Sequence, residues 1–371
     1  MDNLLLSGRY YLPTDALIRR SIESSLARTF ETRGYKEIVP PMLVGLGMAQ
    51  LGPDGPLGAG GPDQHRESAR ASFVVLSRDG NLLTLRSDLT APVAALAARH
   101  LLSPDEPTRL YYSGSVFRAQ KPGSGKPEER RQVGAELIGQ TATGRQTDSE
   151  ILAMAAEGLI NIGLRDFCIG LNDARLLATI LDAAGAQGDM RRQIQSALAS
   201  RDYVQYRELV SSLEDAGAGD LARDARGIDL LKRLPDLHTG PEALNALQVA
   251  GVYEAADDLV GILGTLEDRG LGRYFSLDLA ITREFHYYTG VVFEGYAPGA
   301  GNAVIGGGRY DDLLARFGNS APAAGFAVDV DSVASALEAL EASGTPEGSV
   351  QRWNRQLGPN PDLCQAVRSR H

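Results

Sequence analysis

The sequence predicts an α+β protein in which helices flank an antiparallel sheet and a helical insertion interrupts the chain. Three observations lead to this prediction. Short runs rich in β-branched and aromatic residues recur before residue 172 and again after residue 273. Amphipathic helical patterns flank those runs. The stretch between them has a helical pattern that is broken mainly at glycine and proline.

These changes of pattern divide the chain of 371 residues into four parts. Residues 1–172 and 273–342 are the two portions of one core, residues 173–272 are the helical insertion, and residues 343–371 are a C-terminal tail without periodicity. A chain of this length can bury a large core. We expect the tail to be flexible.

Composition excludes several classes of partner. The formal net charge of -10 argues against general attraction to a phosphate backbone. Two distant cysteines and five histidines show no spacing typical of a disulfide scaffold or a metal site. No apolar run approaches the ~20 residues that cross a bilayer. We therefore expect a cytoplasmic protein that uses no metal or cofactor and binds neither nucleic acid nor a membrane.

A helix followed by an edge strand is predicted near the N-terminus. Apolar residues recur there at a spacing of four, at Ile18, Ile22, Leu26 and Phe30. The strand that follows, residues 34–43, contains two prolines that cannot donate to a β-ladder, so it should lie at a sheet edge or an interface. This pair of elements is a candidate for dimerisation.

A polar turn connects a predicted hairpin, residues 73–85, to the next helix. Asp88 and Thr90 lie where the strand ends and where a helix opened by Pro92 begins. A carboxylate at such a position often caps the helix. Helix capping and ligand binding both remain open for Asp88.

Two further strands, residues 110–118 and 132–139, are predicted to pair antiparallel. Alternation places Gln132, Gly134 and Glu136 on one face. A buried polar group without a partner costs roughly 1–3 kcal/mol, so a glutamine and a carboxylate on one face indicate a site. The alternative is that Glu136 pairs with a neighbouring arginine.

The stretch from Arg283 to Glu294 and the run at residues 306–311 together contain two arginines, three tyrosines and a histidine. A turn-rich segment joins them, which predicts a β-hairpin that carries polar groups into a site. The glycines at 306–308 lack the spacing of a phosphate-binding loop. Close packing of the backbone is their expected role.

These segments bring acids, amides, arginines and phenols to one surface of the sheet. The residues are Asp88, Thr90, Gln132, Glu136, Arg118, Arg283, Tyr288 and Tyr310. Carboxylates and amides satisfy an ammonium, a guanidinium fork satisfies a carboxylate, and a carboxylate with a phenol satisfies an imidazole. The set suits a free amino acid, and histidine is among the candidates.

The same segments resemble the motifs of class II aminoacyl-tRNA synthetases. Residues 34–43 look like motif 1, and the segment that begins at Phe117 looks like motif 2. Residues 85–90 and 283–294 are similar to two signature segments of histidyl-tRNA synthetase. The resemblance extends from about Gly8 to Leu340, apart from the insertion, and implies a class II synthetase-like sheet.

The resemblance also implies a set of histidine-binding residues and no catalytic residue. Each member occupies the matching motif position: Asp88, Thr90, Arg118, Gln132, Glu136, Arg283, Tyr287, Tyr288 and Tyr310. Arg118 would be the motif 2 arginine, which in the synthetase faces the α-phosphate of ATP and the carboxylate of the amino acid.

Departures from the synthetase pattern argue against ATP chemistry. Gln120 stands where motif 2 has a glutamate that helps to hold adenine. Motif 3 of the synthetase ends in Gly-Leu-Glu-Arg, whereas residues 329–332 place Ser332 at the position of the arginine. Such a cation is often worth roughly 3 kcal/mol or more of transition-state stabilisation. We also expect no anticodon-binding domain after Leu340.

A histidine site without ATP chemistry resembles the regulatory subunits of ATP phosphoribosyltransferase, which are paralogues of the synthetase. This resemblance implies a non-catalytic homodimer that assembles with the short-form catalytic subunit in the first step of histidine biosynthesis. It further implies that the subunit is needed for activity and conveys feedback inhibition by L-histidine. The alternative is a truncated synthetase-like enzyme that adenylates histidine or another amino acid.

Overall fold

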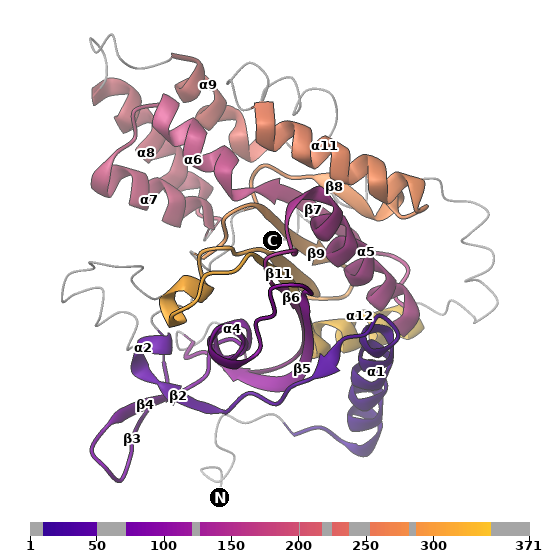
Figure 1. The fold of residues 1–371 in the computed structure, drawn as a ribbon. Coiled ribbons are helices and arrows are strands. Elements are labelled where there is room, and N and C mark those ends of the chain that lie inside the picture. The colour runs from indigo at the N-terminus through magenta and orange to yellow at the C-terminus, as the bar shows by residue number, and fades with distance from the viewer. Residues whose placement is uncertain are drawn as a thin grey trace, which may run out of the picture.

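An eight-stranded sheet runs through the centre of the computed structural model, and a three-stranded sheet lies at one end (Figure 1). The structure describes residues 10–49, 72–120, 127–199, 201–216, 225–236, 253–281 and 287–342. The large sheet has the order β1-β5-β6-β11-β10-β9-β7-β8. Its inner neighbours pair antiparallel, while β1 with β5 and β7 with β8 pair parallel at the two edges. The predicted antiparallel sheet is confirmed, with parallel pairs added at its edges.

The strands of the large sheet agree closely with the predicted β runs. Their bounds are β1 Lys36–Glu37, β5 Thr108–Phe117, β6 Glu129–Ile138, β7 Cys168–Asp173, β8 Phe275–Leu277, β9 Val291–Tyr296, β10 Ile305–Arg309 and β11 Ala323–Asp329. β9 and β10 form the predicted hairpin. Tyr287 and Tyr288 lie before β9 rather than within it.

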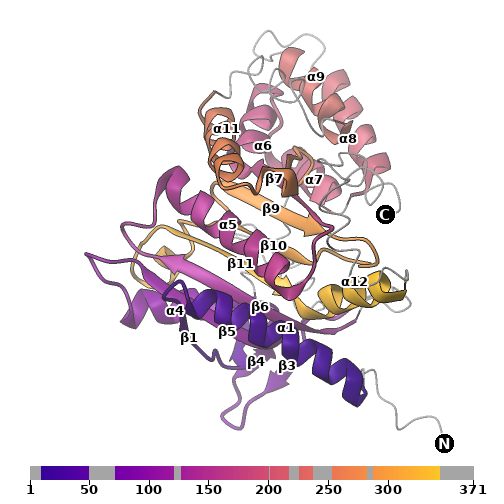
Figure 2. The same cartoon turned by 90° about the vertical axis from the view of Figure 1, so that its right-hand side faces the viewer.

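Three helices cover one face of this sheet (Figure 2). They are α1 Pro13–Glu31, α5 Gly144–Ile162 and α12 Val330–Ala342. The apolar spacing of α1 buries Ile22, Leu26 and Phe30, and the Phe30 ring lies 5.7 Å from the Phe326 ring of β11. We call this side, which carries the alternating apolar residues of β6 and β11, the helix-covered face.

The opposite side of the sheet carries a glycine on each of four strands, and we call it the glycine-rich face. Gly114 of β5, Gly134 of β6, Gly308 of β10 and Gly325 of β11 all lie on it, because opposed residues in antiparallel strands share a face. Helix α4 Thr90–His100 and the 3-10 helix η3 Leu314–Phe317 contact each other beside one end of this face. A second apolar cluster fills that end.

The small sheet has the order β2-β4-β3 and contains the predicted hairpin. Its strands are β2 Leu43–Gly45, β3 Val74–Leu76 and β4 Leu82–Leu85, and helix α2 Leu46–Ala49 follows β2. The single strand predicted at residues 34–43 is wrong in extent. It is divided into β1, which lies at the sheet edge as expected, and the beginning of β2, because Pro40 and Pro41 lack the backbone donors of a ladder.

Helices gather at the end of the molecule opposite the small sheet (Figure 1). They are α6 Ala174–Ala183, α7 Gly188–Ala199, α8 Tyr203–Ala216, α9 Ala225–Arg233 and α11 Tyr253–Asp268, together with the short 3-10 helices η1 Leu234–Asp236 and η2 Gly272–Tyr274. The predicted domain boundaries stay a prediction, and the predicted tail at residues 343–371 lies outside the described residues. Among the helices in the described ranges, none is long and apolar enough to cross a membrane.

Candidate functional site

Glu136 is the centre of a polar cluster on the glycine-rich face. Its side chain is fully buried, and Thr90 and Tyr112 donate to its Oε1 at 2.8 and 2.9 Å. The hydroxyl of Tyr310 donates to Oε2 at 2.5 Å. The three donors come from the start of α4, from β5 and from the residue that follows β10. Among the described residues, these hydroxyls rather than an arginine satisfy the carboxylate.

Glycine is required at the positions that face this cluster. Gly325 lies directly opposite Glu136 in the ladder, and a Cβ there would overlap Glu136 Oε2. A Cβ on Gly134 would lie 2.5 Å from the Tyr112 hydroxyl, and one on Gly308 would lie 2.8 Å from the Tyr288 ring. The missing side chains therefore leave the space that the site residues occupy.

Burial controls the electrostatics of the cluster. It raises the pKa of Glu136 to about 7 against the opposing effect of the three hydroxyls, and the nearby Asp88 raises it further. Burial also raises the pKa of Tyr112 and Tyr310 well above the usual value. The phenols consequently remain donors near neutral pH, while Glu136 can be either an acid or a carboxylate.

Asp88 is buried beside this cluster and caps a helix. Its Oδ1 accepts a hydrogen bond of 2.7 Å from the backbone N–H of Ala91 in the first turn of α4. Burial raises the pKa of Asp88, whereas this hydrogen bond and the charge of Arg118 lower it. The capping alternative is therefore what the structure shows, and a ligand contact for Asp88 stays a prediction.

The remaining predicted site residues differ in what they contact. Tyr287 packs edge-on against Tyr310 with ring centroids 5.7 Å apart, and Tyr288 lies 4.9 Å from Tyr287. Gln132 is partly exposed on the same face, next to Gly114 in the β5–β6 ladder. Arg118 donates through Nε to the carbonyl of Ser87 at 3.1 Å. Arg283 lies outside the described residues.

This arrangement can recognise a ring that carries both a donor and an acceptor. Glu136 can accept a hydrogen bond as a carboxylate or donate one as an acid, and an imidazole offers both kinds of nitrogen near neutral pH. Within the described ranges, no group of three histidines, cysteines or acids is arranged to hold a metal ion. The cluster offers hydrogen-bonding groups that suit a small polar ligand.

Comparison with known sequences gives the family. The histidyl-tRNA synthetase family model matches residues 9–333. An ATP phosphoribosyltransferase regulatory subunit from Desulforamulus reducens is 34% identical over 90% of this chain and 78% of its own length. The one from Moorella thermoacetica is 37% identical over 86% of this chain and 78% of its own length. The chain belongs to the ATP phosphoribosyltransferase regulatory subunit family.

Solved structures related to this regulatory subunit family have the same fold. An ATP phosphoribosyltransferase regulatory subunit/histidyl-tRNA synthetase from Bacillus halodurans superposes with a TM-score of 0.74 at 30% identity, covering 91% of this chain and 83% of its own. A histidine–tRNA ligase subunit from Alicyclobacillus acidocaldarius gives 0.71 at 29% identity, covering 92% of this chain and 98% of its own. The predicted class II synthetase-like fold is confirmed.

In this member of the regulatory subunit family, an ion pair lies near Ser332, the residue that the resemblance aligns with the motif 3 arginine. Asp329 lies opposite Gln132 on the glycine-rich face, and its Oδ1 accepts from the backbone N–H of Ser332 at 2.8 Å. Its Oδ2 lies 2.8 Å from Arg130 Nε, close enough for an ion pair although no N–H is aimed at that oxygen. Ser332 is thus a buried residue in the first turn of α12.

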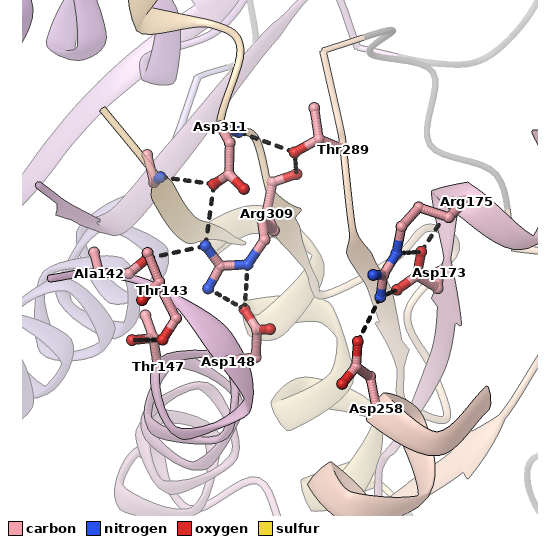
Figure 3. A network of polar contacts seen from close by, with 11 residues as sticks. Ala142, Thr143, Thr147, Asp148, Asp173, Arg175, Asp258, Thr289, Arg309 and Asp311 are labelled. Carbon is pink, nitrogen blue, oxygen red and sulfur yellow. Dashed lines mark hydrogen bonds and ion pairs between the residues drawn. The ribbon is translucent and has the colours of Figure 1, made fainter. Parts of the chain in front are cut away.

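The predicted set of site residues did not include two residues of the Glu136 cluster, and another residue of the hairpin lies on the other face. Tyr112 and Gly325 were not predicted, although the pairing of Tyr112 with Gly134 places it on the same face as Glu136. Arg309, the second arginine of the hairpin, points to the helix-covered face instead. There it donates to Asp148 at 2.7 and 3.0 Å and to the carbonyl of Ala142 at 2.9 Å (Figure 3). It anchors α5 to the sheet.

Proposed function

We propose that this chain is a non-catalytic regulatory subunit that binds free L-histidine at Glu136. It would act on the short-form catalytic subunit of ATP phosphoribosyltransferase, in the first step of histidine biosynthesis. The observation that carries this proposal is the buried carboxylate held by three hydroxyls on the glycine-rich face. Family membership supplies the enzyme with which the relatives are named.

Each part of histidine has a partner in the proposed complex. The imidazole would lie against Glu136, with the Tyr288 ring beside it. The ammonium would bind the predicted acceptors Asp88, Thr90 and Gln132, and the carboxylate would bind the predicted arginines Arg118 and Arg283. Histidine would inhibit by favouring one arrangement of the regulatory subunit, to the extent that its affinities for the two arrangements differ.

The same face argues against adenylation of the bound amino acid. A triphosphate needs cations, whereas Asp329 adds a carboxylate that already pairs with Arg130. The side chain of Gln120 donates to the carbonyl of Arg118 at 3.3 Å, in the place where the synthetase has its adenine-binding glutamate. These groups support a subunit that binds histidine and does not activate it.

We also propose that the subunit is a homodimer. The connector between β1 and β2 and the small sheet expose several large apolar side chains: Val39 at 82%, Met42 at 50%, Leu76 at 68% and Leu82 at 52%. Large exposed apolar residues that lie near one another favour an interface. The proposed partner at this surface is a second copy of the chain. The connector belongs to residues 34–43, the segment that resembles motif 1 and is a candidate for dimerisation.

Calorimetry with L-histidine tests the site directly. We expect the wild-type chain to bind, and Glu136→Ala to weaken binding at least about tenfold, because a charge-assisted hydrogen bond is worth about 1.5–3 kcal/mol. Glu150→Ala is the matched control, since Glu150 of α5 pairs with Arg109 of β5 on the helix-covered face, away from the site. Equal affinity in the wild type and the Glu136 variant would show that the site is elsewhere.

Co-expression tests the regulatory role. A short-form ATP phosphoribosyltransferase catalytic subunit should co-purify with this chain, gain activity, and lose that activity when L-histidine is added. Absence of a complex would contradict the proposal. Histidine-dependent exchange of pyrophosphate into ATP by the isolated chain would instead support the adenylating enzyme.

A further inference from the structure

Arg86 is a buried cation whose hydrogen bonds all go to backbone carbonyls in the part of the chain that the structure describes. It is 6% exposed, and its side-chain hydrogen bonds to the described residues go to carbonyls rather than to a carboxylate. Its Nε donates to the carbonyl of Ser115 and its Nη1 to the carbonyl of Pro40, both at 2.7 Å. Burial lowers the pKa of this guanidinium, and the charge of Arg131 contributes. A buried charge without a counter-charge is costly, so it needs a structural or functional reason.

The guanidinium and the backbone N–H of Arg86 both bind the exposed apolar connector between β1 and β2. Pro40 lies between Val39 and Met42, which belong to the proposed dimer surface. Besides the guanidinium bond to Pro40, the backbone N–H of Arg86 donates to the carbonyl of Met42 at 3.0 Å. Two hydrogen bonds from one residue therefore fix the backbone of the connector.

The backbone that follows Arg86 continues to Thr90, which belongs to the Glu136 cluster. Its carbonyl accepts from the N–H of Phe117 at 2.9 Å, and the carbonyl of the next residue accepts from Arg118. Asp88, two residues after Arg86, caps α4, and the Thr90 hydroxyl donates to Glu136. The chain from Arg86 to Thr90 is thus held at almost every residue between the connector and the candidate site.

The sheet itself leaves room for this guanidinium. Gly114 of β5 lies beneath Arg86, and a Cβ at that position would overlap one guanidinium nitrogen. Gly114 is paired with Gln132, a predicted ligand residue. The guanidinium is therefore seated on the glycine-rich face, beside the candidate site.

We propose that Arg86 couples histidine binding to dimerisation. The inference rests on the proposed function, because it needs both a histidine site and a dimer. Histidine held by Asp88 and Thr90 fixes the turn, Arg86 fixes the Pro40 carbonyl to that turn, and the ordered connector strengthens the contact between two copies. Because such coupling is reciprocal, dimerisation tightens histidine binding by the same factor.

Exchange of subunits between two fluorescently labelled pools of the full chain measures this coupling, even for a tight dimer. We expect saturating L-histidine to slow exchange of the wild type about tenfold, which corresponds to a tenfold gain in dimer affinity when the association rate is unchanged. Coupled sites usually change affinity by about 5- to 150-fold. In Arg86→Lys the charge remains, but a single ammonium lacks the planar fork that reaches both carbonyls. The histidine effect should then fall below about twofold.

Two comparisons separate coupling from general damage. Arg99→Lys alters an exposed arginine near the end of α4 and should retain the tenfold effect. Gly114→Ala displaces the guanidinium while keeping its charge, and should reduce the effect as Arg86→Lys does. Calorimetry on each variant shows whether histidine still binds, and circular dichroism shows that the chain is folded.

Three outcomes would overturn the inference. The first is wild-type exchange that histidine does not change although calorimetry shows binding. The second is an undiminished histidine effect in folded Arg86→Lys and Gly114→Ala. The third is a chain that is monomeric with and without histidine. A wild type that binds no histidine would instead overturn the proposed function.

Discussion

The two faces of the central sheet both bury charged side chains, but they stabilise them in different ways. On the helix-covered face, Arg309 has a counter-charge in Asp148 and further acceptors in Ala142 and Asp311 (Figure 3). On the glycine-rich face, Glu136 has three neutral hydroxyl donors in the described residues. Burial raises the pKa of both Asp148 and Glu136, but the charge of Arg309 opposes the rise for Asp148, whereas only neutral hydroxyls of the described residues oppose it for Glu136, whose pKa reaches about 7.

The difference separates a structural group from a ligand-binding one. A buried ion pair with all its hydrogen bonds made gains nothing from a ligand, whereas a buried acid without a cation is stabilised by any ligand that brings positive charge or an N–H donor. Arg309 and Tyr310 are adjacent in one sequence motif but serve opposite faces. Motif membership alone therefore does not identify a ligand residue.

The largest effect is expected from breaking the ion pair of the helix-covered face. Asp148→Ala leaves Arg309 buried without its main counter-charge, and this should lower the free energy of unfolding by about 3–5 kcal/mol. Urea denaturation measures the change. A loss below about 1 kcal/mol would mean that Asp311 and the carbonyl of Ala142 suffice for Arg309.

On the glycine-rich face, Glu136→Gln should remove a pH dependence of the free energy of unfolding. The folded chain binds the Glu136 proton more tightly than the unfolded chain, because the pKa rises from 4.5 to about 7. This contribution to stability is complete below about pH 4.5 and is lost as pH rises through 7, a total of about 3 kcal/mol.

Urea denaturation of the wild type and of Glu136→Gln between pH 4 and 8 measures the contribution of Glu136. The contributions of other titratable groups cancel in the difference between the two proteins. The stability of the wild type relative to the variant should fall across the window. Parallel curves would show that Glu136 titrates normally in the folded chain.

Gly325→Ala tests whether the absence of side chains on this face is required. The added methyl would overlap Glu136 Oε2 and lie 2.6 Å from the carbonyl of Ala135, so overpacking should cost about 1–3 kcal/mol and displace Glu136. Histidine affinity by calorimetry should fall together with stability. Gly301→Ala is the matched control, because a Cβ there meets nothing within 4 Å.

The smallest effect is expected at an exposed ion pair. Asp189→Ala removes the partner of Arg192 on α7, where both side chains are well exposed, and should change stability by less than about 1 kcal/mol. The same urea experiment applies. A loss comparable with that of Asp148→Ala would remove the distinction between buried and exposed pairs on which the comparison rests.

Local patterns predicted most of the fold and the face on which Glu136 lies, whereas a ligand contact for Glu136 stays a prediction. Period-two alternation put Glu136 on the same face as Gly134, and the turn signals gave the β5–β6 and β9–β10 pairs. Tyr112 was missed because its position relative to Glu136 depends on the register between β5 and β6, which the intervening loop does not specify in the sequence. The capping role of Asp88 was foreseen only as one of two alternatives, because a cap and a ligand need the same residue type.

The ion pair between Arg309 and Asp148 also stabilises the pairing register of β10. Successive residues of a strand alternate between faces, so a slip of β10 by one residue would exchange all its side chains across the sheet. Such a slip would bring Arg309 to the Glu136 side and turn the Tyr310 hydroxyl toward α5. The attachment of Arg309 to α5 opposes that error from the far side of the sheet. Arg309 therefore helps to keep the Tyr310 hydroxyl on the Glu136 side of the sheet, although Arg309 itself lies on the other face.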